Sequence, residues 1–220
     1  MKKRSLNDRL ADKEKLGVVR PKSNDDRHSA AFRRQFKDHA EFTELDENGR
    51  ARIKRVYLGV WRVPSLPLRE RRREQALLVL LYLAGLALFL LAATRPVPAN
   101  GLWYLAAAQF VVIAAAAYTL TGLYNYLTAG EKLTEVDYNS GTLRVRYGFL
   151  AMAAAQLLCA LLYLFFALRL RFALRAQLLC ALFTFFGAAA LFAANRLDAR
   201  IEYHEEPNKE VVPDDAVRIE

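Results

Sequence analysis

The sequence predicts an α-helical integral membrane protein with four transmembrane helices and a small cytoplasmic antiparallel β element made from two hairpins. Three observations support this fold class. The chain contains four long uncharged segments, and its excess of positive charge lies entirely before the first of them. In addition, two segments outside the apolar ones alternate apolar and polar residues, which is typical of β-strands.

The four uncharged segments are long enough to cross a bilayer. A helix rises about 1.5 Å per residue and the hydrocarbon core is roughly 30 Å thick, so about 20 apolar residues are needed. The segments comprise residues 75–94, 96–130, 147–168 and 176–195. Because they are apolar all round, they do not resemble the one-sided helices of a soluble bundle. We therefore expect transmembrane helices 1 and 2 within residues 69–128, and helices 3 and 4 within residues 148–195.

Positive charge predicts the orientation. Residues 1–74 hold 21 Lys and Arg against 12 Asp and Glu, which accounts for the whole net charge of +9. Bases close to the first span keep its N-terminal side in the cytoplasm, and four crossings return the C-terminus to the same side. No apolar signal-peptide core occurs in residues 1–74. The expected location is the plasma (inner) membrane, multi-pass, with both termini cytoplasmic.

Two arginine clusters are candidate contacts for lipid headgroups. The first directly precedes the first span, and the second separates the third and fourth spans. The second cluster falls on the exterior side, against the charge rule, but long arginine stems can reach phosphate groups from there. Anionic headgroups of the bilayer are thus an expected partner. The candidate residues are Arg69, Arg71, Arg72, Arg73, Arg169, Arg171 and Arg175.

Alternating patterns predict the two hairpins. In residues 41–68, a short strand, a turn ending in Asn48 and Gly49, and a strand reaching Trp61 follow one another. Asn-Gly supplies the positive φ angles that tight hairpin turns require. Residues 129–147 repeat this design around Asn139-Ser140-Gly141. Since a lone hairpin is not stable in water, we expect the two to join into one sheet.

The two ends of the chain are expected to be mostly solvated. Residues 1–40 form a basic, largely disordered cytoplasmic tail in which residues 29–39 favour a short helix with Phe32 and Phe36 on one face. That face would lie on an anionic membrane surface or pack on the cytoplasmic part of the protein. In residues 196–220 we expect the last helix to continue to Pro207, followed by an acidic tail that is solvated or rests on the basic block.

The sequence predicts no reaction centre. Carboxylates, Lys and His inside spans usually mark proton or ion coupling, and the four uncharged segments contain none. His204 with its two following glutamates lacks the second half of a metal site. The two cysteines have apolar neighbours, which raise the pKa of a thiol. We therefore expect no catalytic, cofactor-binding or metal-binding residue, no cofactor and no nucleic-acid partner.

A repeated segment singles out candidate helix-packing residues. The letters AQLLCAL occur at residues 155–161 and again at residues 176–182. Neutral polar groups inside spans join helices through hydrogen bonds, and small residues allow close packing. The candidates are Gln156, Cys159, Gln177 and Cys180. A local duplication, a shared packing requirement and coincidence all remain open as explanations.

Three functional classes fit these features. The preferred one is a non-enzymatic accessory, regulatory or assembly subunit of a membrane complex, acting through a protein partner or self-association. The alternative is a homo-oligomeric small-solute transporter or channel, whose pathway would lie between protomers. A membrane enzyme acting on lipid ranks third because it needs acids, bases or metal ligands at the interface.

Overall fold

The computed structural model describes residues 29–36, 38–45, 51–170, 173–208 and 217–218. These residues belong to two compact units. The smaller unit takes its residues from Met1–Leu58 and Lys209–Glu220, and the larger unit is Gly59–Asn208.

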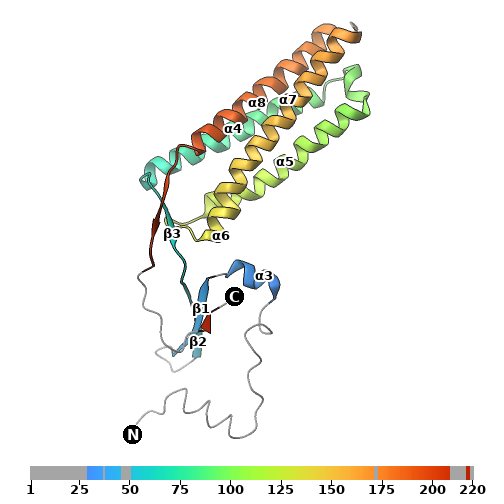
Figure 1. Ribbon diagram of the computed structural model, residues 1–220. Coiled ribbons are helices and arrows are strands. Elements are labelled where there is room, and N and C mark those ends of the chain that lie inside the picture. The colour runs from blue at the N-terminus through green and yellow to red at the C-terminus, as the bar shows by residue number, and fades with distance from the viewer. Residues whose placement is uncertain (1–28, 37, 46–50, 171–172, 209–216, 219–220) are drawn as a thin grey trace, which may run out of the picture. The chain divides into compact units, whose positions relative to one another are not determined.

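Four long helices form the larger unit (Figure 1). They are α4 (Leu68–Ala93), α5 (Trp103–Thr128), α7 (Arg144–Leu170) and α8 (Leu174–Asp198). Helices α5, α7, α8 and α4 lie side by side in that order, and a 3₁₀ turn, η1 (Pro98–Gly101), connects α4 to α5. Each of the four is long and apolar enough to cross a membrane, which confirms the predicted number of such helices.

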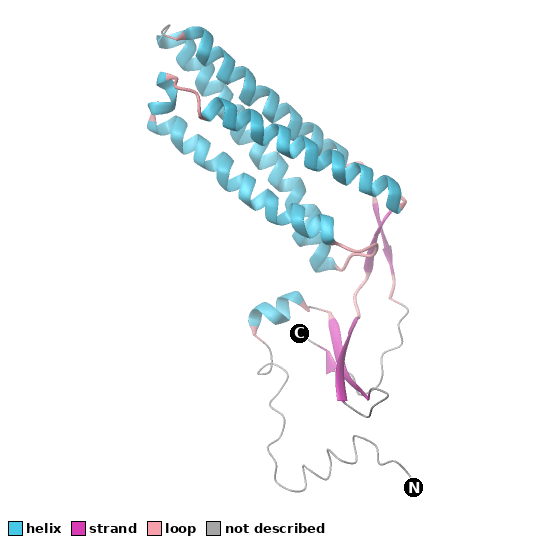
Figure 2. Cartoon of the chain, turned by 180° about the vertical axis from the view of Figure 1, so that it is seen from behind, coloured by secondary structure: helices cyan, strands magenta, loops and turns pink. Residues whose placement is uncertain are grey.

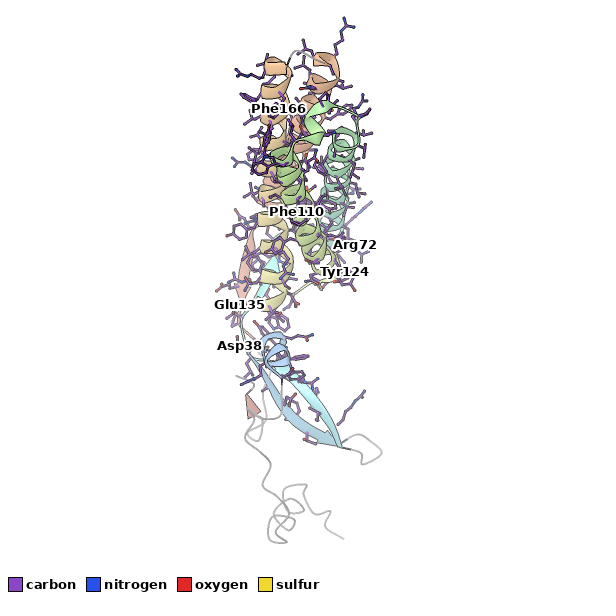
Figure 3. The ribbon with its side chains drawn as sticks, turned by 90° about the vertical axis from the view of Figure 1, so that its right-hand side faces the viewer. Asp38, Arg72, Phe110, Tyr124, Glu135 and Phe166 are labelled. Atoms are coloured by element: carbon purple, nitrogen blue, oxygen red, sulfur yellow. The ribbon has the colours of Figure 1, made fainter. Side chains whose placement is uncertain are left out.

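The bundle has an apolar interior and an apolar exterior. Leu78, Val112 and Met152 are among the fully buried side chains of its core. Large apolar side chains such as Phe110 and Tyr124 are also exposed on the outer faces (Figure 3). Extended apolar surface of this kind is unusual in a protein that meets only water, and it is what hydrocarbon requires.

The prediction of a hairpin at residues 129–147 is wrong, because most of this stretch is helical. Helix α6 (Glu135–Asp137) leads through a π-helical turn, η2 (Tyr138–Leu143), directly into α7. Thr134 and Asp137 form a reciprocal capping box, which stabilises a helix start at this point. Gly141, predicted as a turn residue, instead allows close packing, since a Cβ there would lie 3.2 Å from the backbone nitrogen of Tyr126.

The single sheet predicted from two hairpins is replaced by two small sheets (Figure 2). In the larger unit, β3 (Trp61–Pro64) pairs antiparallel with β4 (Tyr203–Glu206), with Val63 opposite His204. Leu133 adds one isolated bridge to Arg62. The strand expected to run from residue 50 to residue 61 is therefore divided between the two units.

The predicted extension of the last helix to Pro207 is also wrong. Helix α8 ends at Asp198, and the chain turns at Ala199 before entering β4. A helix through this stretch would place like charges four residues apart, at Arg196 and Arg200, which is unfavourable. Pairing with β3 instead satisfies the backbone groups of β4.

The smaller unit contains the first predicted hairpin. Strands β1 (His39–Leu45) and β2 (Ala51–Tyr57) pair antiparallel, which confirms the hairpin, and β5 (Val217–Arg218) pairs with the other edge of β1. The predicted turn at residues 46–49 lies outside the described residues, as do the predicted tails at residues 1–28 and 209–216.

A short helix packs on this hairpin. Helix α3 (Ala30–Gln35) is capped by Ser29, whose hydroxyl accepts a hydrogen bond from the backbone of Phe32. The rings of Phe32 and Phe36 lie 4.5 Å apart, and the guanidinium group of Arg55 on β2 lies 4.9 and 4.8 Å from their centroids. The aromatic face predicted for this helix therefore packs on the sheet.

Candidate functional site

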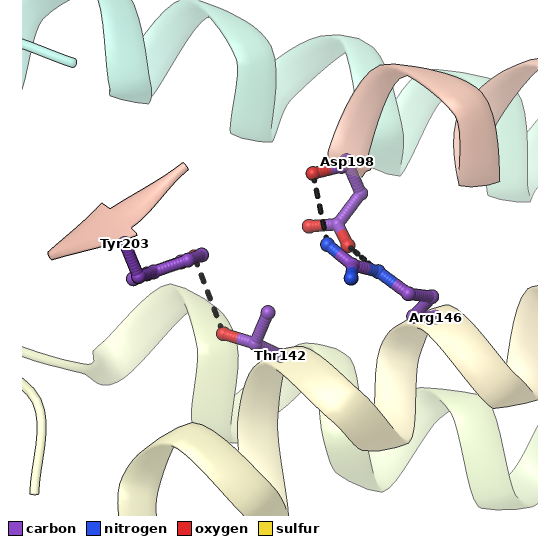
Figure 4. A network of polar contacts seen from close by, with 4 residues as sticks. All are labelled: Thr142, Arg146, Asp198 and Tyr203. Carbon is purple, nitrogen blue, oxygen red and sulfur yellow. Dashed lines mark hydrogen bonds and ion pairs between the residues drawn. The ribbon is translucent and has the colours of Figure 1, made fainter. Parts of the chain in front are cut away.

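A buried polar cluster lies at the end of the bundle where α7 begins and α8 ends. The Arg146 guanidinium on α7 donates from Nε to the Asp198 carboxylate at 3.0 Å and from Nη2 to the Asp198 carbonyl at 3.2 Å (Figure 4). The Asp198 side chain has an exposed fraction of 0%, against 26% for Arg146. Because the carboxylate is fully buried, it depends on this ion pair.

Tyr203 on β4 extends the cluster. Its hydroxyl lies 3.3 Å from that of Thr142 in η2 (Figure 4). Burial is the main cause that raises the pKa of Tyr203 above its ordinary value. The charge of Asp198 also raises this pKa, and that of Arg71 lowers it.

Arg71 differs from the three arginines beside it. Its side chain, in the first turns of α4, is only 3% exposed, and its Nη1 donates to the carbonyl of Gly130 at 2.8 Å. Its Nε and Nη2 atoms are buried and have no hydrogen-bond partner among the described residues. Arg69, Arg72 and Arg73 are exposed instead, as Figure 3 shows for Arg72. The predicted headgroup cluster before α4 therefore contains one buried arginine and three exposed ones.

The second predicted arginine cluster lies between α7 and α8. Arg169 and Arg175 are exposed there, and Arg171 lies outside the described residues. The cluster is at the end of the bundle opposite to Arg69, because α7 and α8 join at that end (Figure 1).

All four candidate packing residues are fully buried in the bundle. The Gln156 side chain on α7 donates to the carbonyl of Gly85 on α4 at 3.1 Å. The thiol of Cys180 on α8 donates to the carbonyl of Ala92 at 3.6 Å. Cys159 and Gln177 have no exposed area. The repeated segments thus place the same two residue types in the interior of two neighbouring helices.

A second surface feature is an apolar groove between α7 and α8, with a volume of about 340 Å³. On each helix the lining follows the order large, small, small, large, at spacings of 3, 1 and 3 residues, and every lining residue is apolar. We call it the α7–α8 groove. Its residues are Leu150, Ala153, Ala154 and Leu157 on α7, and Phe185, Ala188, Ala189 and Phe192 on α8.

Sequence reasoning missed this groove, although its signal is present in the chain. The two Ala-Ala pairs, 153–154 and 188–189, are each flanked by a large apolar residue three positions before and after. Residues at these spacings share one face of a helix, so each Ala-Ala pair forms a hollow between two large side chains.

The described residues contain no group of three or more His, Cys, Asp or Glu that could hold a metal ion. His204 lies beside Glu206, whose carboxylate accepts a hydrogen bond from Lys132 at 2.7 Å. That hydrogen bond is the main cause that lowers the pKa of Glu206 below its ordinary value. His204 and Glu206 on β4 therefore form, with Lys132, an exposed group of charged side chains on the β3–β4 sheet.

Comparison of the chain with protein-family models, with curated proteins and with solved structures gives no match.

Proposed function

We propose that this chain is a non-enzymatic, multi-pass protein of the plasma membrane that serves as an accessory or assembly subunit. It binds a transmembrane helix of a partner protein in the α7–α8 groove. The main support for this proposal is the shape of that groove, in which alanines lie between large apolar side chains on both helices.

The dimensions of the α7–α8 groove suit one crossing helix. The large residues at its two ends, Leu150 and Leu157 on α7, are seven residues apart, which corresponds to about 10 Å along the helix axis. A helix with its side chains is roughly 10–12 Å across. The alanine floor allows a partner backbone to come close, and close packing over small residues is a main source of helix association in membranes.

The chemistry of the groove argues against a polar solute. Sites for small ligands combine apolar walls with a few polar groups that fix the ligand's orientation. All eight lining residues here are apolar, so nothing would orient such a ligand.

The shape also argues against a symmetric pair of chains. In a two-fold dimer, the same patch of both copies meets. Two concave grooves facing each other would leave an unfilled space, whereas a convex helix of another protein fills one groove.

We further propose that both termini lie in the cytoplasm. Strand β3 precedes α4 and strand β4 follows α8, and their pairing brings both ends of the larger unit to one end of the bundle. The exposed arginines Arg69, Arg72 and Arg73 lie at that end, where positive charge favours the cytoplasmic side.

Site-specific photocrosslinking in the native membrane tests the docking proposal. A photoreactive residue at Ala154, in the groove, is expected to give one discrete crosslinked product of higher mass. The same residue at Ala114, exposed on α5, is the matched control and is expected to react with lipid only. Filling the groove by Ala189→Phe is expected to abolish the product at Ala154 without changing the helix content of the protein.

Two results would contradict the proposal. Equal products from Ala154 and Ala114, or a product that persists in Ala189→Phe, would mean that the groove holds no specific helix. A product that joins two differently tagged copies of this chain would instead favour the homo-oligomeric transporter or channel.

A further inference from the structure

Arg196 lies at one mouth of the α7–α8 groove. Its guanidinium carbon is 5.1 Å from the centre of the Phe192 ring, and Phe192 is the last residue of α8 that lines the groove. Arg196 follows Phe192 by four residues, so it lies on the same face of the helix, about 6 Å closer to its end. Contact with the aromatic ring therefore places a positive charge beside a groove that is lined only by apolar residues.

This positive charge has no opposite charge to balance it. Arg196 is exposed and forms no ion pair among the described residues. The carboxylate of Asp198 is fully buried and is paired with Arg146 instead. Arg200, in the turn after α8, is exposed and adds a second positive charge, while the exposed Glu202 forms no ion pair with either arginine. Arg196 can therefore still gain an ion pair with another molecule.

The same mouth of the groove lies at the expected border between hydrocarbon and water. Arg196 is the first charged residue after the uncharged segment 176–195. On α7, Tyr147 comes three residues before the lining residue Leu150 and is 61% exposed. Tyrosine side chains are frequent at membrane–water interfaces, and positive charge is frequent on the cytoplasmic side. Because the neighbouring hydrocarbon lowers the local dielectric constant, an ion pair here is stronger than one in bulk water.

We propose that the partner helix in the α7–α8 groove carries an aspartate or glutamate at its cytoplasmic end, and that this carboxylate pairs with Arg196. The inference rests on the proposed docking function. A helix roughly 10–12 Å across would displace lipid from the groove, so that its flank lies beside the guanidinium in place of a lipid headgroup. The planar guanidinium can donate two parallel hydrogen bonds to one carboxylate.

An acidic residue at this place would make the groove selective. The cytoplasmic flanks of transmembrane helices are rich in Lys and Arg. A helix with such a flank would be repelled by Arg196 and Arg200, whereas a helix with a carboxylate there gains an ion pair. The apolar lining cannot make this distinction, because it offers no charge or hydrogen-bonding side chain. The groove thus supplies close packing, and Arg196 supplies the choice of partner.

The photoreactive residue at Ala154 provides the first test in the native membrane. Arg196→Gln is expected to lower the yield of the crosslinked product about fivefold, as loss of a partly exposed ion pair implies. Arg196→Glu would repel the carboxylate and is expected to lower the yield further. The matched control is Arg175→Gln, which removes an exposed charge at the opposite end of α8 and is expected to leave the yield unchanged.

A zero-length carbodiimide, which joins an amine to a carboxylate as an amide, identifies the partner's group directly. Arg196→Lys is expected to give a carbodiimide product with the same partner, and peptide mapping is expected to place the amide between position 196 and an aspartate or glutamate. Wild type and Arg175→Lys are expected to lack this linkage. The combination of Arg196→Lys with Ala189→Phe, which fills the groove, is expected to lack it as well.

Failure of this inference differs from failure of the docking proposal. An unchanged Ala154 product in Arg196→Gln and Arg196→Glu, with no carbodiimide linkage at position 196, would overturn the acidic partner but leave docking in place. Arg196 would then face a lipid headgroup. The lack of any discrete product from Ala154 in the otherwise unaltered chain would contradict docking itself, and the acidic partner with it.

Discussion

Gly187→Leu is expected to destabilise the bundle by about 3 kcal/mol, as overpacking of a buried helix crossing does. Gly187 on α8 lies where α7 and α4 also meet. A Cβ at this position would overlap Oε1 of Gln156 and lie 3.1 Å from the carbonyl oxygen of Gly85. The larger side chain would therefore separate the helices and break the hydrogen bond from Gln156 to Gly85. Reversible unfolding in mixed detergent micelles measures the loss of unfolding free energy.

Ala193→Leu is the matched control for this prediction. Ala193 is exposed on the same helix, so a larger apolar side chain there would extend into the surrounding detergent. We expect its effect on the free energy of unfolding to be within about 0.5 kcal/mol, as for surface changes generally. If both variants unfold alike, the close three-helix contact at Gly187 is incorrect.

Asp198→Ala is expected to cost about 3 kcal/mol of unfolding free energy, because removal of one member of a buried ion pair leaves its partner uncompensated. Arg146 would lose the hydrogen bond from Nε to the carboxylate and keep only the one from Nη2 to the Asp198 carbonyl. A double-mutant cycle with Arg146→Ala isolates the energy of the pair.

Glu205→Ala provides the comparison for an exposed pair. Glu205 contacts Arg62 at 3.3 Å, with side chains 60% and 31% exposed. Exposed ion pairs contribute less than about 1 kcal/mol to the free energy of unfolding in water. A coupling energy for Asp198 and Arg146 no larger than that for Glu205 and Arg62 would show that the buried pair is not a structural requirement.

The elements that could be predicted from the sequence are those specified by local pattern. Length and lack of charge alone indicate the four long helices, and a short alternating run with an Asn-Gly turn indicates the β1–β2 hairpin. The same kind of alternation led to the wrong prediction of a strand at residues 142–147, where the pattern is only six residues long. The capping box of Thr134 and Asp137, together with continuity into an apolar span, favours the helix instead.

The β3–β4 sheet could not be predicted in this way. Its two strands have four residues each and are separated by the whole bundle, so neither has a local partner. Only the packing of α4 against α8 brings them together. The predicted helical extension beyond Asp198 failed for the same reason, since pairing between distant segments outweighed local helical spacing.

The burial of Arg71 does have a signal in the sequence. The buried positions of α4 are Arg71, Leu78, Tyr82, Gly85, Phe89 and Ala92, which recur at the spacing of one helix face. Arg71 continues this interior face, whereas Arg69, Arg72 and Arg73 fall beside it. Four neighbouring arginines that look equivalent in composition are therefore distinguished by helical periodicity.

The most direct test of the central claim, a four-span membrane protein with both ends in the cytoplasm, is thiol labelling in intact cells. The two native cysteines are first changed to Ala. A single cysteine then replaces one of three exposed residues: Gly101 between α4 and α5, Asn139 in η2, or Arg200 after α8. An impermeant maleimide is expected to label only the cysteine at position 101, and to label those at positions 139 and 200 after permeabilisation. Labelling at position 139 or 200 in intact cells would contradict the account.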